Sequence, residues 1–432
     1  MSSPVPAASS FSSPLAVDLE RIKADIHALA AIGHNDADRG IYRMAFTDAD
    51  MEGKRWLLHR IEENDLVPAS DGAANISGIL PGKVENPRVF VGSHIDTVPC
   101  AGMLDGTLGV VIGLECLRTL RAAGVELERP IELIAFSDEE GRFGGMFGSE
   151  AFTGALTPEK LLSAKDLNAV LLSDAMLEQG LDPKRALDAR RPPTDIGAYL
   201  ELHIEQGPVL DQSLQQVGIV EQITGLRSWS LKLTGEANHA GTTPMDYRKD
   251  ALMGLADFAH EIPRILDENG GEHSRATIGK AEVQPGAPNS VPGTVVFSLD
   301  FRDPSSETLE ALSQAFQKAL AAISRRRGLQ FEVNVQGDIK PVPCLPELAD
   351  LLEAEAQRLD LRYRRMLSGA AHDAQMVGRV APMAMVFVPS RGGMSHSPAE
   401  WTAWGDIEAG ANLMLGALHR LATQETLPTS TS

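Results

Sequence analysis

The chain has 432 residues, with 39 Lys and Arg against 59 Asp and Glu, so its formal net charge is −20. This length suggests about two or three domains, and hydrophobic and charged contents of 43% and 23% exclude a disordered chain, a coiled coil and a collagen. The acidic excess argues against nucleic acid and anionic membranes as partners, because both bind basic surfaces, and it favours a small-molecule partner.

The two ends of the chain and its cysteines indicate a cellular location. We expect disordered tails at 1–18 and 425–432, and the first tail lacks the basic and apolar regions of a secretory signal. No stretch approaches the ~18 consecutive apolar residues of a membrane-spanning helix. Cys100, Cys116 and Cys344 lie far apart without a CxxC pair, which excludes a disulfide framework and a thiolate zinc site. We therefore predict a cytoplasmic protein.

From residue 19 onward, helical patterns and buried-strand patterns alternate. Apolar residues spaced by three and four between 19 and 66 predict two helices at the start of the chain. The alternation that follows is typical of a three-layer α/β domain with a mostly parallel sheet, and polar side chains follow the strands, where such sheets bind ligands. The secure strands are predicted at 88–92, 131–136, 199–204 and 383–388, and the helices include 107–121 and 347–359.

Residues 219–335 follow a different order and predict a domain inserted between two parts of the first domain, 19–218 and 336–424. The order strand, helix, strand, strand, helix, strand is that of a ferredoxin-like α+β module. Segments rich in Gly, Pro and Asp at the flanks, 207–212 and 337–343, are typical of hinges. After a first strand around Trp229, we predict a helix at 246–266, strands at 276–283 and 294–303, a helix at 305–324 and a strand at 329–335.

Histidines and carboxylates occur close to the ends of the predicted strands. His94 is followed two residues later by Asp96, and this step can supply both a metal ligand and the carboxylate that orients its ring. Asp105 lies between Leu104 and Gly106 just before a helix, so it could equally cap that helix or form a turn.

Four further candidates lie within or after other strands. Two adjacent carboxylates, Glu139 and Glu140, rarely point the same way, so one could bind a metal while the other acts as a general base; a solvated acidic cluster is the alternative. His203 lies within a strand, where it could instead be a hydrogen-bonded core residue. His396 lies in a loop of Gly, Ser and Pro residues, where a ligand role and a plain loop role are both open.

Together, these residues supply three imidazoles and two or three carboxylates near the ends of four strands of one sheet. Nitrogen and oxygen ligands of this kind suit Zn²⁺, Mn²⁺ or Co²⁺. A carboxylate that bridges two such ions ~3.5–4 Å apart would make hydroxide available at neutral pH. The residues therefore predict a hydrolase that uses divalent metal ions.

Eight motifs in this order resemble the M20-type metallohydrolases, and within them the amidase, hydantoinase and carbamoylase branch, which includes N-carbamoyl-L-amino acid hydrolases and allantoate amidohydrolases. The resemblance covers about residues 19–421. It implies a zinc-peptidase-like catalytic domain and an inserted lid domain through which the chain forms a homodimer. The motifs are GSHIDTVP, LDG at 104–106, FSDEEG, ELHIEQG, GEANHAGTTPM, APNSVPG, SGAAHDA and SHSPAEW.

The resemblance also implies two divalent metal ions per subunit, with Zn, Mn and Co as candidates. Glu139 would be the base that takes a proton from the attacking water and passes it to the leaving nitrogen. The peptidase branches commonly have a carboxylate at the position of His203, whereas HIEQG resembles the carbamoylase branch. The two ions would share Asp105: His94, Asp105 and His203 would hold one ion, and Asp105, Glu140 and His396 the other.

Residues of the inserted domain would contact the substrate. His239 resembles a histidine that reaches across the dimer to stabilise the oxyanion, and a loop histidine that caps a turn is the alternative. Asn289 and Arg302 resemble the family's binders of the substrate carboxylate, a task that suits the planar guanidinium. Arg302 could instead pair with Asp300 or Asp303 on the strand surface.

In the catalytic domain, Gln206 and His372 would lie near the substrate, although the roles of His372 and Asp373 stay open. The leading hypothesis is cleavage of the carbamoyl C–N bond of an N-carbamoyl-L-amino acid, which yields the amino acid, ammonia and carbon dioxide. The first alternative is allantoate or another ureido acid as the substrate. An M20-type peptidase or an N-acyl amino acid deacylase is less favoured because of HIEQG, and a non-catalytic binding protein is disfavoured because every predicted ligand and base position is filled.

Overall fold

The structure is a computed structural model that describes residues 15–427 and divides into two compact units. Within the described residues, unit 1 comprises the chain up to Glu221, Cys344–Met366 and the chain from His372 onward; unit 2 comprises Gln222–Pro343 and Leu367–Ala371. The inserted domain was predicted at 219–335.

Most of the predicted tails, at 1–18 and 425–432, lies outside the described residues. The described part of the first tail, 15–18, makes specific contacts: the backbone N–H of Val17 donates to Asn412, and Asp18 caps the first helix through the N–H groups of Glu20 and Arg21.

A nine-stranded sheet forms the core of unit 1. Its four central strands, at 131–136, 88–94, 196–204 and 383–388, run parallel, and the strands outside them pair antiparallel. The predicted α/β fold with a mostly parallel sheet is confirmed. The order is β1 (Val67–Ser70), β2 (Ile76–Leu80), β4 (Ile131–Phe136), β3 (Arg88–His94), β5 (Ile196–Ile204), β16 (Met383–Val388), β6 (Val217–Ile223) and β14 (Val342–Pro343), with β15 (Tyr363–Ser368) also on β6.

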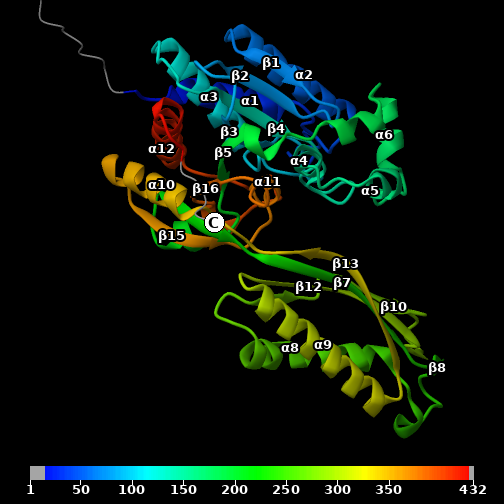
Figure 1. Cartoon of the computed structure of the whole chain (residues 1–432). Coiled ribbons are helices and arrows are strands. Elements are labelled where there is room, and N and C mark those ends of the chain that lie inside the picture. The colour runs from blue at the N-terminus through cyan, green and yellow to red at the C-terminus, as the bar shows by residue number, and fades with distance from the viewer. Residues whose placement is uncertain (1–14, 428–432) are drawn as a thin grey trace, which may run out of the picture. The chain divides into compact units, whose positions relative to one another are not determined.

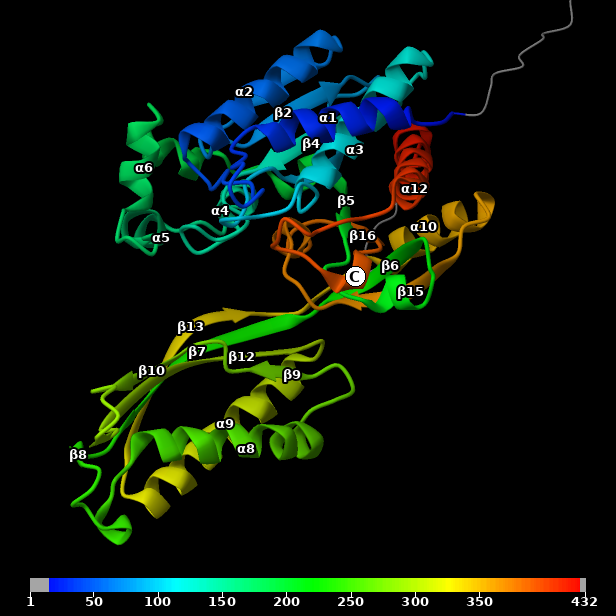
Figure 2. The same cartoon turned by 180° about the vertical axis from the view of Figure 1, so that it is seen from behind.

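Helices cover both faces of this sheet, as the two views show (Figure 1 and Figure 2). Successive strand residues point to opposite faces, so Val91 of β3 faces α3 near Gly113, whereas Phe90 meets Phe152 of α4 with ring centroids 5.3 Å apart. On the first face lie α1 (Leu19–Ala31), α2 (Asp48–Glu63), α3 (Thr107–Ala122) and α12 (Trp404–Thr423), with α10 (Pro346–Arg358) against α12; on the second lie α4 (Phe147–Thr153) and α11 (Asp373–Val377).

The segment between β4 and β5 forms an additional helical layer around a small apolar cluster that includes Phe46, Phe143 and Phe147. Its elements are α5 (Pro158–Ser163), α6 (Leu172–Glu178) and two 3₁₀ turns at Pro183–Asp188 and Pro193–Asp195, and a short helix, α7 (Val209–Gln212), follows β5. The residue pattern did not predict β1 or β2, because β1 is a short exposed strand with a proline and β2 is interrupted by Gly78.

Unit 2 has the predicted ferredoxin-like architecture. In its antiparallel sheet the first strand of the unit lies between the last and the third, which is the order β10–β12–β7–β13, and β9 also pairs with β12. The elements are β7 (Gly225–Thr234), α8 (Ala251–Asn269), β9 (Arg275–Thr277), β10 (Ala281–Gln284), β12 (Thr294–Asp303), α9 (Ser306–Arg327) and β13 (Gln330–Ile339), with the small ribbon β8 (Asn238–His239) and β11 (Ser290–Val291).

Three predicted boundaries in unit 2 differ from the observed ones. The strand predicted at 276–283 consists of β9 and β10, which pair with different stretches of β12. The helix predicted to begin at residue 246 begins at Ala251, because the Asp250 carboxylate accepts the N–H groups of Leu252 and Met253 and caps it there. The last strand continues to Ile339 through an irregular register after Val335.

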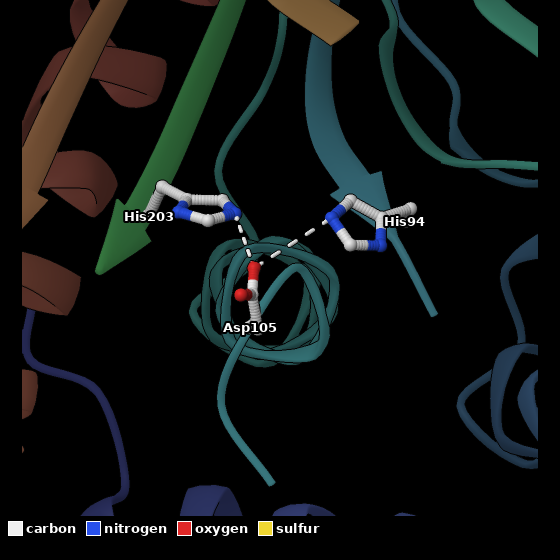
Figure 3. Close-up of side chains that lie close together, drawn as sticks. All are labelled: His94, Asp105 and His203. Atoms are coloured by element: carbon white, nitrogen blue, oxygen red, sulfur yellow. Dashed lines mark ion pairs between the residues drawn. The ribbon is translucent and has the colours of Figure 1, made fainter. Parts of the chain in front are cut away.

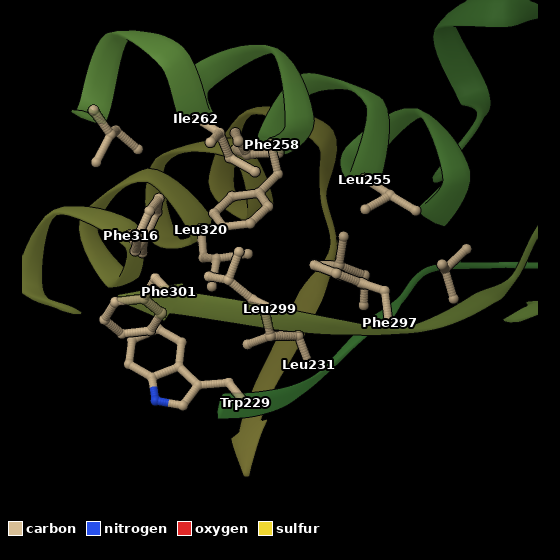
Figure 4. Close-up of a cluster of buried hydrophobic side chains, with 14 of the residues drawn as sticks. Trp229, Leu231, Leu255, Phe258, Ile262, Phe297, Leu299, Phe301, Phe316 and Leu320 are labelled. Carbon is tan, nitrogen blue, oxygen red and sulfur yellow. The ribbon is translucent and has the colours of Figure 1, made fainter. Parts of the chain in front are cut away.

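The core of unit 2 lies between one face of its sheet and the helices α8 and α9 (Figure 4). Alternate residues of β7 and β12 supply it, and Trp229 meets Phe301 edge-on with centroids 4.9 Å apart. Phe316 of α9 contacts both Phe258 of α8 and Phe301. Aromatic rings of this size dominate the burial of apolar area, so they fix the helices on the sheet. None of the helices between residues 15 and 427 has the length and apolar character needed to cross a membrane.

Candidate metal centre

The predicted ligands of unit 1 lie at one edge of its sheet, because the carboxyl ends of the four parallel strands meet there. His94 is the last residue of β3, and His203 is the last but one of β5. The remaining candidates lie in the loops after strands or before a helix: Glu139 and Glu140 after β4, Asp105 before α3, and His396 after β16.

The structure brings five of these side chains together in two groups that share Asp105. One ligand atom from each member of a group lies within 4.8 Å of the others. Oδ1 of Asp105 is 3.2 Å from Nε2 of His203 and 3.9 Å from Nε2 of His94. Figure 3 shows both imidazoles turned toward this carboxylate. The groups are His94, Asp105 and His203, and Asp105, Glu140 and His396.

The second group lies on the other oxygen of the same carboxylate. Nε2 of His396 is 3.3 Å from Oδ2 of Asp105 and 3.3 Å from Oε2 of Glu140. The second oxygen of Glu140, Oε1, is buried and has no hydrogen-bond partner among the described residues. A buried carboxylate oxygen without a donor is energetically costly unless a cation contacts it, so the donor set fits a divalent ion.

The two buried histidines are oriented by backbone carbonyl groups. Nδ1 of His94 lies 3.0 Å from the carbonyl oxygen of Asp96, and Nδ1 of His203 lies 2.9 Å from that of Ile204. A carbonyl oxygen only accepts, so Nδ1 carries the hydrogen in both rings and Nε2 is the nitrogen that faces Asp105. This arrangement is usual for a histidine that binds a metal.

Asp96 therefore acts differently from the prediction. Its backbone carbonyl, and not its carboxylate, orients His94, since the carboxylate Oδ1 is 3.9 Å from Nδ1. The carboxylate instead accepts the backbone N–H groups of Glu139 at 3.3 Å and Glu140 at 3.2 Å. Burial, partly offset by His94, raises the pKa of Asp96 to about 6. Asp96 thus holds the turn that carries the two adjacent glutamates.

Asp105 does not cap the following helix, which was the alternative for this residue. Gly106 occupies the cap position of α3 with a φ of +62°, and no side chain caps the helix there. A Cβ at Gly106 would lie 2.3 Å from ring atoms of His94, so only glycine fits beside the histidine. The LDG motif therefore leaves the Asp105 carboxylate free to face the imidazoles.

The adjacent glutamates diverge, as expected. Oε2 of Glu139 lies 3.5 Å from Nε2 of His94, whereas Glu140 contacts His396. Burial raises the pKa of Glu139 well above its usual range, and the negative charges of Asp373 and Glu140 add to the increase. A raised pKa makes the carboxylate a stronger proton acceptor, which is the property that a general base needs.

Two further predicted residues contact the ligand groups directly. The amide of Gln206 donates to Oδ2 of Asp105 at 2.7 Å. His372 is buried, and its ring lies edge-on to His203 with centroids 4.5 Å apart. These contacts place both residues at the centre, and their role in binding a substrate stays a prediction.

His203 and His372 also form a third group of possible ligands with Glu201. Glu201, however, accepts hydrogen bonds from the Ser93 hydroxyl at 2.7 Å and from the backbone N–H of Ala374 at 2.9 Å. Neutral donors therefore occupy its oxygens, and Glu201 connects β5, which carries His203, to β3 and to the start of α11.

In unit 2, His239 and Asn289 lie together in the β8–β11 ribbon, where the N–H of Ala240 donates to the carbonyl of Asn289. Nδ1 of His239 accepts the backbone N–H groups of Gly241 at 3.0 Å and Thr242 at 3.3 Å, which is the turn-capping contact considered as the alternative. Because Nδ1 accepts, the hydrogen of the neutral ring is on Nε2. The exposed His239 side chain therefore presents a donor.

Arg302 makes one of the two ion pairs considered as alternatives to carboxylate binding. Its guanidinium donates to both oxygens of Asp300, at 2.9 and 3.3 Å, and to the carbonyl of Gly369 at 2.7 Å. The Asp303 carboxylate accepts instead from Ser274 and Ser305. The Arg302 side chain keeps one third of its surface exposed.

Sequence reasoning missed two residues at the centre, Ser395 and Glu400. The Ser395 hydroxyl lies 2.7 Å from Oδ2 of Asp105, and Glu400 accepts the backbone N–H groups of Leu104 and Asp105. Both lie in the SHSPAEW motif with His396, so the motif itself was the signal.

The sequence of residues 90–420 matches Peptidase family M20/M25/M40. The chain belongs to this family. The resemblance drawn from the motifs is thereby confirmed, and this M20-family chain is a hydrolase.

Relatives with curated names cover nearly the whole M20-family chain. It is 36% identical over 405 residues to the N-carbamoyl-L-amino-acid amidohydrolase of Paenarthrobacter aurescens, covering 93% of this chain and 98% of the relative. It is also 36% identical over 389 residues to the allantoate amidohydrolase of Bacillus subtilis, covering 89% and 94%. A solved structure of a hydantoinase/carbamoylase family amidase from Burkholderia multivorans is 34% identical with a TM-score of 0.86, and the match covers 96% of this chain and 100% of that one.

Metal affinity should increase with pH, because protons and ions compete for the same nitrogens. Burial alone would lower the pKa of His203, but its hydrogen bond to Asp105 and the charge of Asp105 raise it to about 9. Hydrogen bonds to Asp105 and Glu140 raise the pKa of His396 to about 10. Both rings are therefore protonated at neutral pH in the ion-free protein, and each displaced proton should strengthen binding by up to ~10-fold per pH unit below these values.

Calorimetric titration of the ion-free protein with Mn²⁺, at about pH 6, 7 and 8, measures this competition. Buffers with different ionisation enthalpies report the number of protons released. An affinity that is constant with pH, with no proton release, would contradict the assignment of these histidines as ligands.

Proposed function

We propose that the chain is a metal-dependent amidohydrolase that cleaves the carbamoyl C–N bond of an N-carbamoyl-L-amino acid, giving the amino acid, ammonia and carbon dioxide. The observation that carries this proposal is the pair of ligand groups that share the Asp105 carboxylate beside the buried Glu139. The named activities of the relatives support a ureido acid as the substrate.

The five ligands would hold two divalent ions, with Zn, Mn and Co as candidates. Imidazole and carboxylate ligands accept all three, so availability decides between them. When bound, such ions lower the pKa of a water molecule and polarise a carbonyl oxygen.

Glu139 is the proposed general base. Its carboxylate would take a proton from the attacking water and release it to the departing nitrogen, and the raised pKa suits a group that must hold a proton between these two steps. Asp96 fixes the backbone of Glu139, so the carboxylate stays beside His94. Gln206 and His372, which contact Asp105 and His203, are the proposed neighbours of the substrate.

Unit 2 would supply the groups that recognise the rest of the substrate. The Nε2–H of His239 is suited to donate to the developing oxyanion, and Asn289 and Arg302 are suited to bind the carboxylate. A substrate carboxylate would take the place of Asp300 on the Arg302 guanidinium, because both oxygens of Asp300 now occupy that fork.

The positions of these residues within unit 2 favour a homodimer. Arg302 lies eight positions after Thr294 on β12 (302 − 294 = 8), which is ~27 Å along an extended strand. The ribbon with His239 and Asn289 continues from the Thr294 end, where Gly235 donates to Gly293. A small ureido acid is too short to contact both ends of one copy. We therefore propose that two copies form each site, with Arg302 from one and His239 and Asn289 from the other.

Allantoate or another ureido acid is the second candidate substrate. The observation in its favour is that the named allantoate amidohydrolase is as similar to this chain, at 36% identity, as the named carbamoylase. Both substrates contain a carboxylate and a ureido group, so the same residues could recognise either.

The substrate proposal predicts which compounds release ammonia. We expect the purified protein with added Mn²⁺ to release ammonia from N-carbamoyl-L-amino acids faster than from allantoate or N-carbamoyl-β-alanine, and not to hydrolyse N-acetyl amino acids or dipeptides. Ammonia and free amino acid are measured in parallel, and a chelator-treated sample is the control. Preference for allantoate would select the second candidate, and hydrolysis of only dipeptides or acetyl compounds would refute both.

The base assignment predicts that Glu139→Gln loses turnover and keeps its metal. The amide cannot take up a proton, so kcat should fall by ~10²–10⁴-fold while the Mn²⁺ content stays that of the parent. Steady-state kinetics and elemental analysis of the same preparation measure both quantities. Glu140→Gln, at the neighbouring position, is the matched control variant. It should lose Mn²⁺, because Glu140 is a proposed ligand. A Glu139→Gln protein with parental turnover would remove Glu139 from the base role.

The two-copy site predicts that two inactive variants complement each other. His239→Ala and Arg302→Ala should each be nearly inactive, whereas a refolded equal mixture should regain about a quarter of parental activity, because half of the dimers are mixed and each has one intact site. Each variant refolded alone is the control. A mixture that forms mixed dimers, shown by mass spectrometry, and stays inactive would refute the shared site.

A further inference from the structure

Glu400 lies directly behind the loop that carries Asp105. Its side chain is buried, with 4% of the residue exposed. Oε1 of Glu400 accepts the backbone N–H of Leu104 at 2.7 Å and that of Asp105 at 3.1 Å. A Cβ at Gly102 would lie 2.5 Å from the Glu400 side chain, so the loop lies tightly against the carboxylate.

The other oxygen of Glu400 contacts the loop of a second ligand. The Ser395 hydroxyl lies 3.2 Å from Oε2 of Glu400 and 2.7 Å from Oδ2 of Asp105. Ser395 directly precedes His396. One buried carboxylate therefore connects the Asp105 loop with the His396 loop, although Leu104 and Glu400 are 296 residues apart in the chain.

This connection matters because Glu400 is the acceptor for the two backbone N–H groups that directly precede Gly106. Gly102 and Gly106 flank the Asp105 loop, and no side chain caps α3 at Gly106. The N–H groups of Leu104 and Asp105 are buried at this point, and they would lose their acceptor if the Glu400 carboxylate were absent. We would then expect the loop to shift so that these N–H groups find other acceptors, and the Asp105 carboxylate would shift with it.

We propose that Glu400 is a positioning residue of the metal centre, which holds Asp105 and His396 at the separation that an ion shared by Asp105, Glu140 and His396 requires. Ser395 transmits the effect between the two loops. Glu400 itself contacts backbone and hydroxyl groups and is not a ligand. The inference rests on the proposed metal centre, and the parental protein tests that centre separately.

Mn²⁺ titration of the full-length, ion-free protein by calorimetry tests the proposal. The parental chain should bind two ions, and His396→Ala identifies the step that belongs to the Asp105, Glu140 and His396 group. In Glu400→Ala the affinity of that step should fall by ~10–100-fold, more than the affinity of the other step, because groups that orient ligands have effects of this size. Glu400→Gln should stay close to the parent, since its amide oxygen still accepts both backbone N–H groups and its NH₂ can donate to Ser395.

A matched control separates positioning from stability alone. Glu355 is another glutamate with 2% exposure, and it pairs with Arg358 and Arg420 between α10 and α12. Glu355→Ala should lower the melting temperature as much as Glu400→Ala or more, yet leave both Mn²⁺ steps unchanged. A merely structural role of Glu400 would give the same result in both variants.

Ser395→Ala tests the same positioning role if Glu400→Ala does not fold. Ser395 is only partly buried, and its substitution should weaken the same Mn²⁺ step while the fold stays intact. If Glu400→Ala folds and binds Mn²⁺ with parental affinities, the positioning role is overturned. If Glu400→Ala is unfolded, parental affinities in Ser395→Ala overturn it. Neither result contradicts the metal centre itself. A parental chain that binds no Mn²⁺ would overturn the centre and the inference together.

Discussion

The carboxylate of Asp105 is the point on which the candidate site depends. One of its oxygens faces His94 and His203, and the other faces His396, so two ligand groups exist only because this side chain lies between them. Asp105 can take this position only because the next residue, Gly106, has no Cβ that would clash with the His94 ring. The sheet supplies the two buried histidines on strands, and hydrogen bonds from other groups hold the loop before α3 so that Asp105 meets them.

Electrostatics explains why this edge of the sheet would favour divalent cations. Burial raises the pKa values of Asp96, Glu139 and Asp373, and neighbouring carboxylates add to the increase for all three. Without ions, several of these groups can avoid the cost of buried negative charge only by binding protons. Divalent ions would remove that constraint, and the surrounding carboxylates would then ionise. Metal binding, proton uptake and folding of this edge are therefore expected to be linked.

The sequence predicted this site better than it predicted the details around it. The order of strands and helices, and the glycine beside Asp105, were sufficient to place residues such as His94 and His203 at one edge, because parallel strands bring their carboxyl ends together. The prediction that the Asp96 carboxylate orients His94 was wrong. A backbone carbonyl orients the ring instead, and the residue pattern does not show backbone contacts. The Asp300 partner of Arg302 was one of two open alternatives, although period-two alternation favours Asp300, which shares the face of Arg302, over Asp303 on the buried face.

In unit 2, the residues proposed to recognise the substrate lie toward opposite ends of a single strand. Arg302 lies near one end of β12 and the His239 ribbon continues from the other, and the aromatic core around Trp229 and Phe316 keeps the strand between them rigid. A rigid strand fixes this separation, so bending of the unit cannot bring both groups onto one small molecule. In the proposed dimer, a second copy would supply the missing group without any change in the strand, since a twofold axis would bring opposite ends of the two copies together. Substrate recognition and assembly would then be selected together, because a substitution that weakens the dimer also removes half of each recognition site.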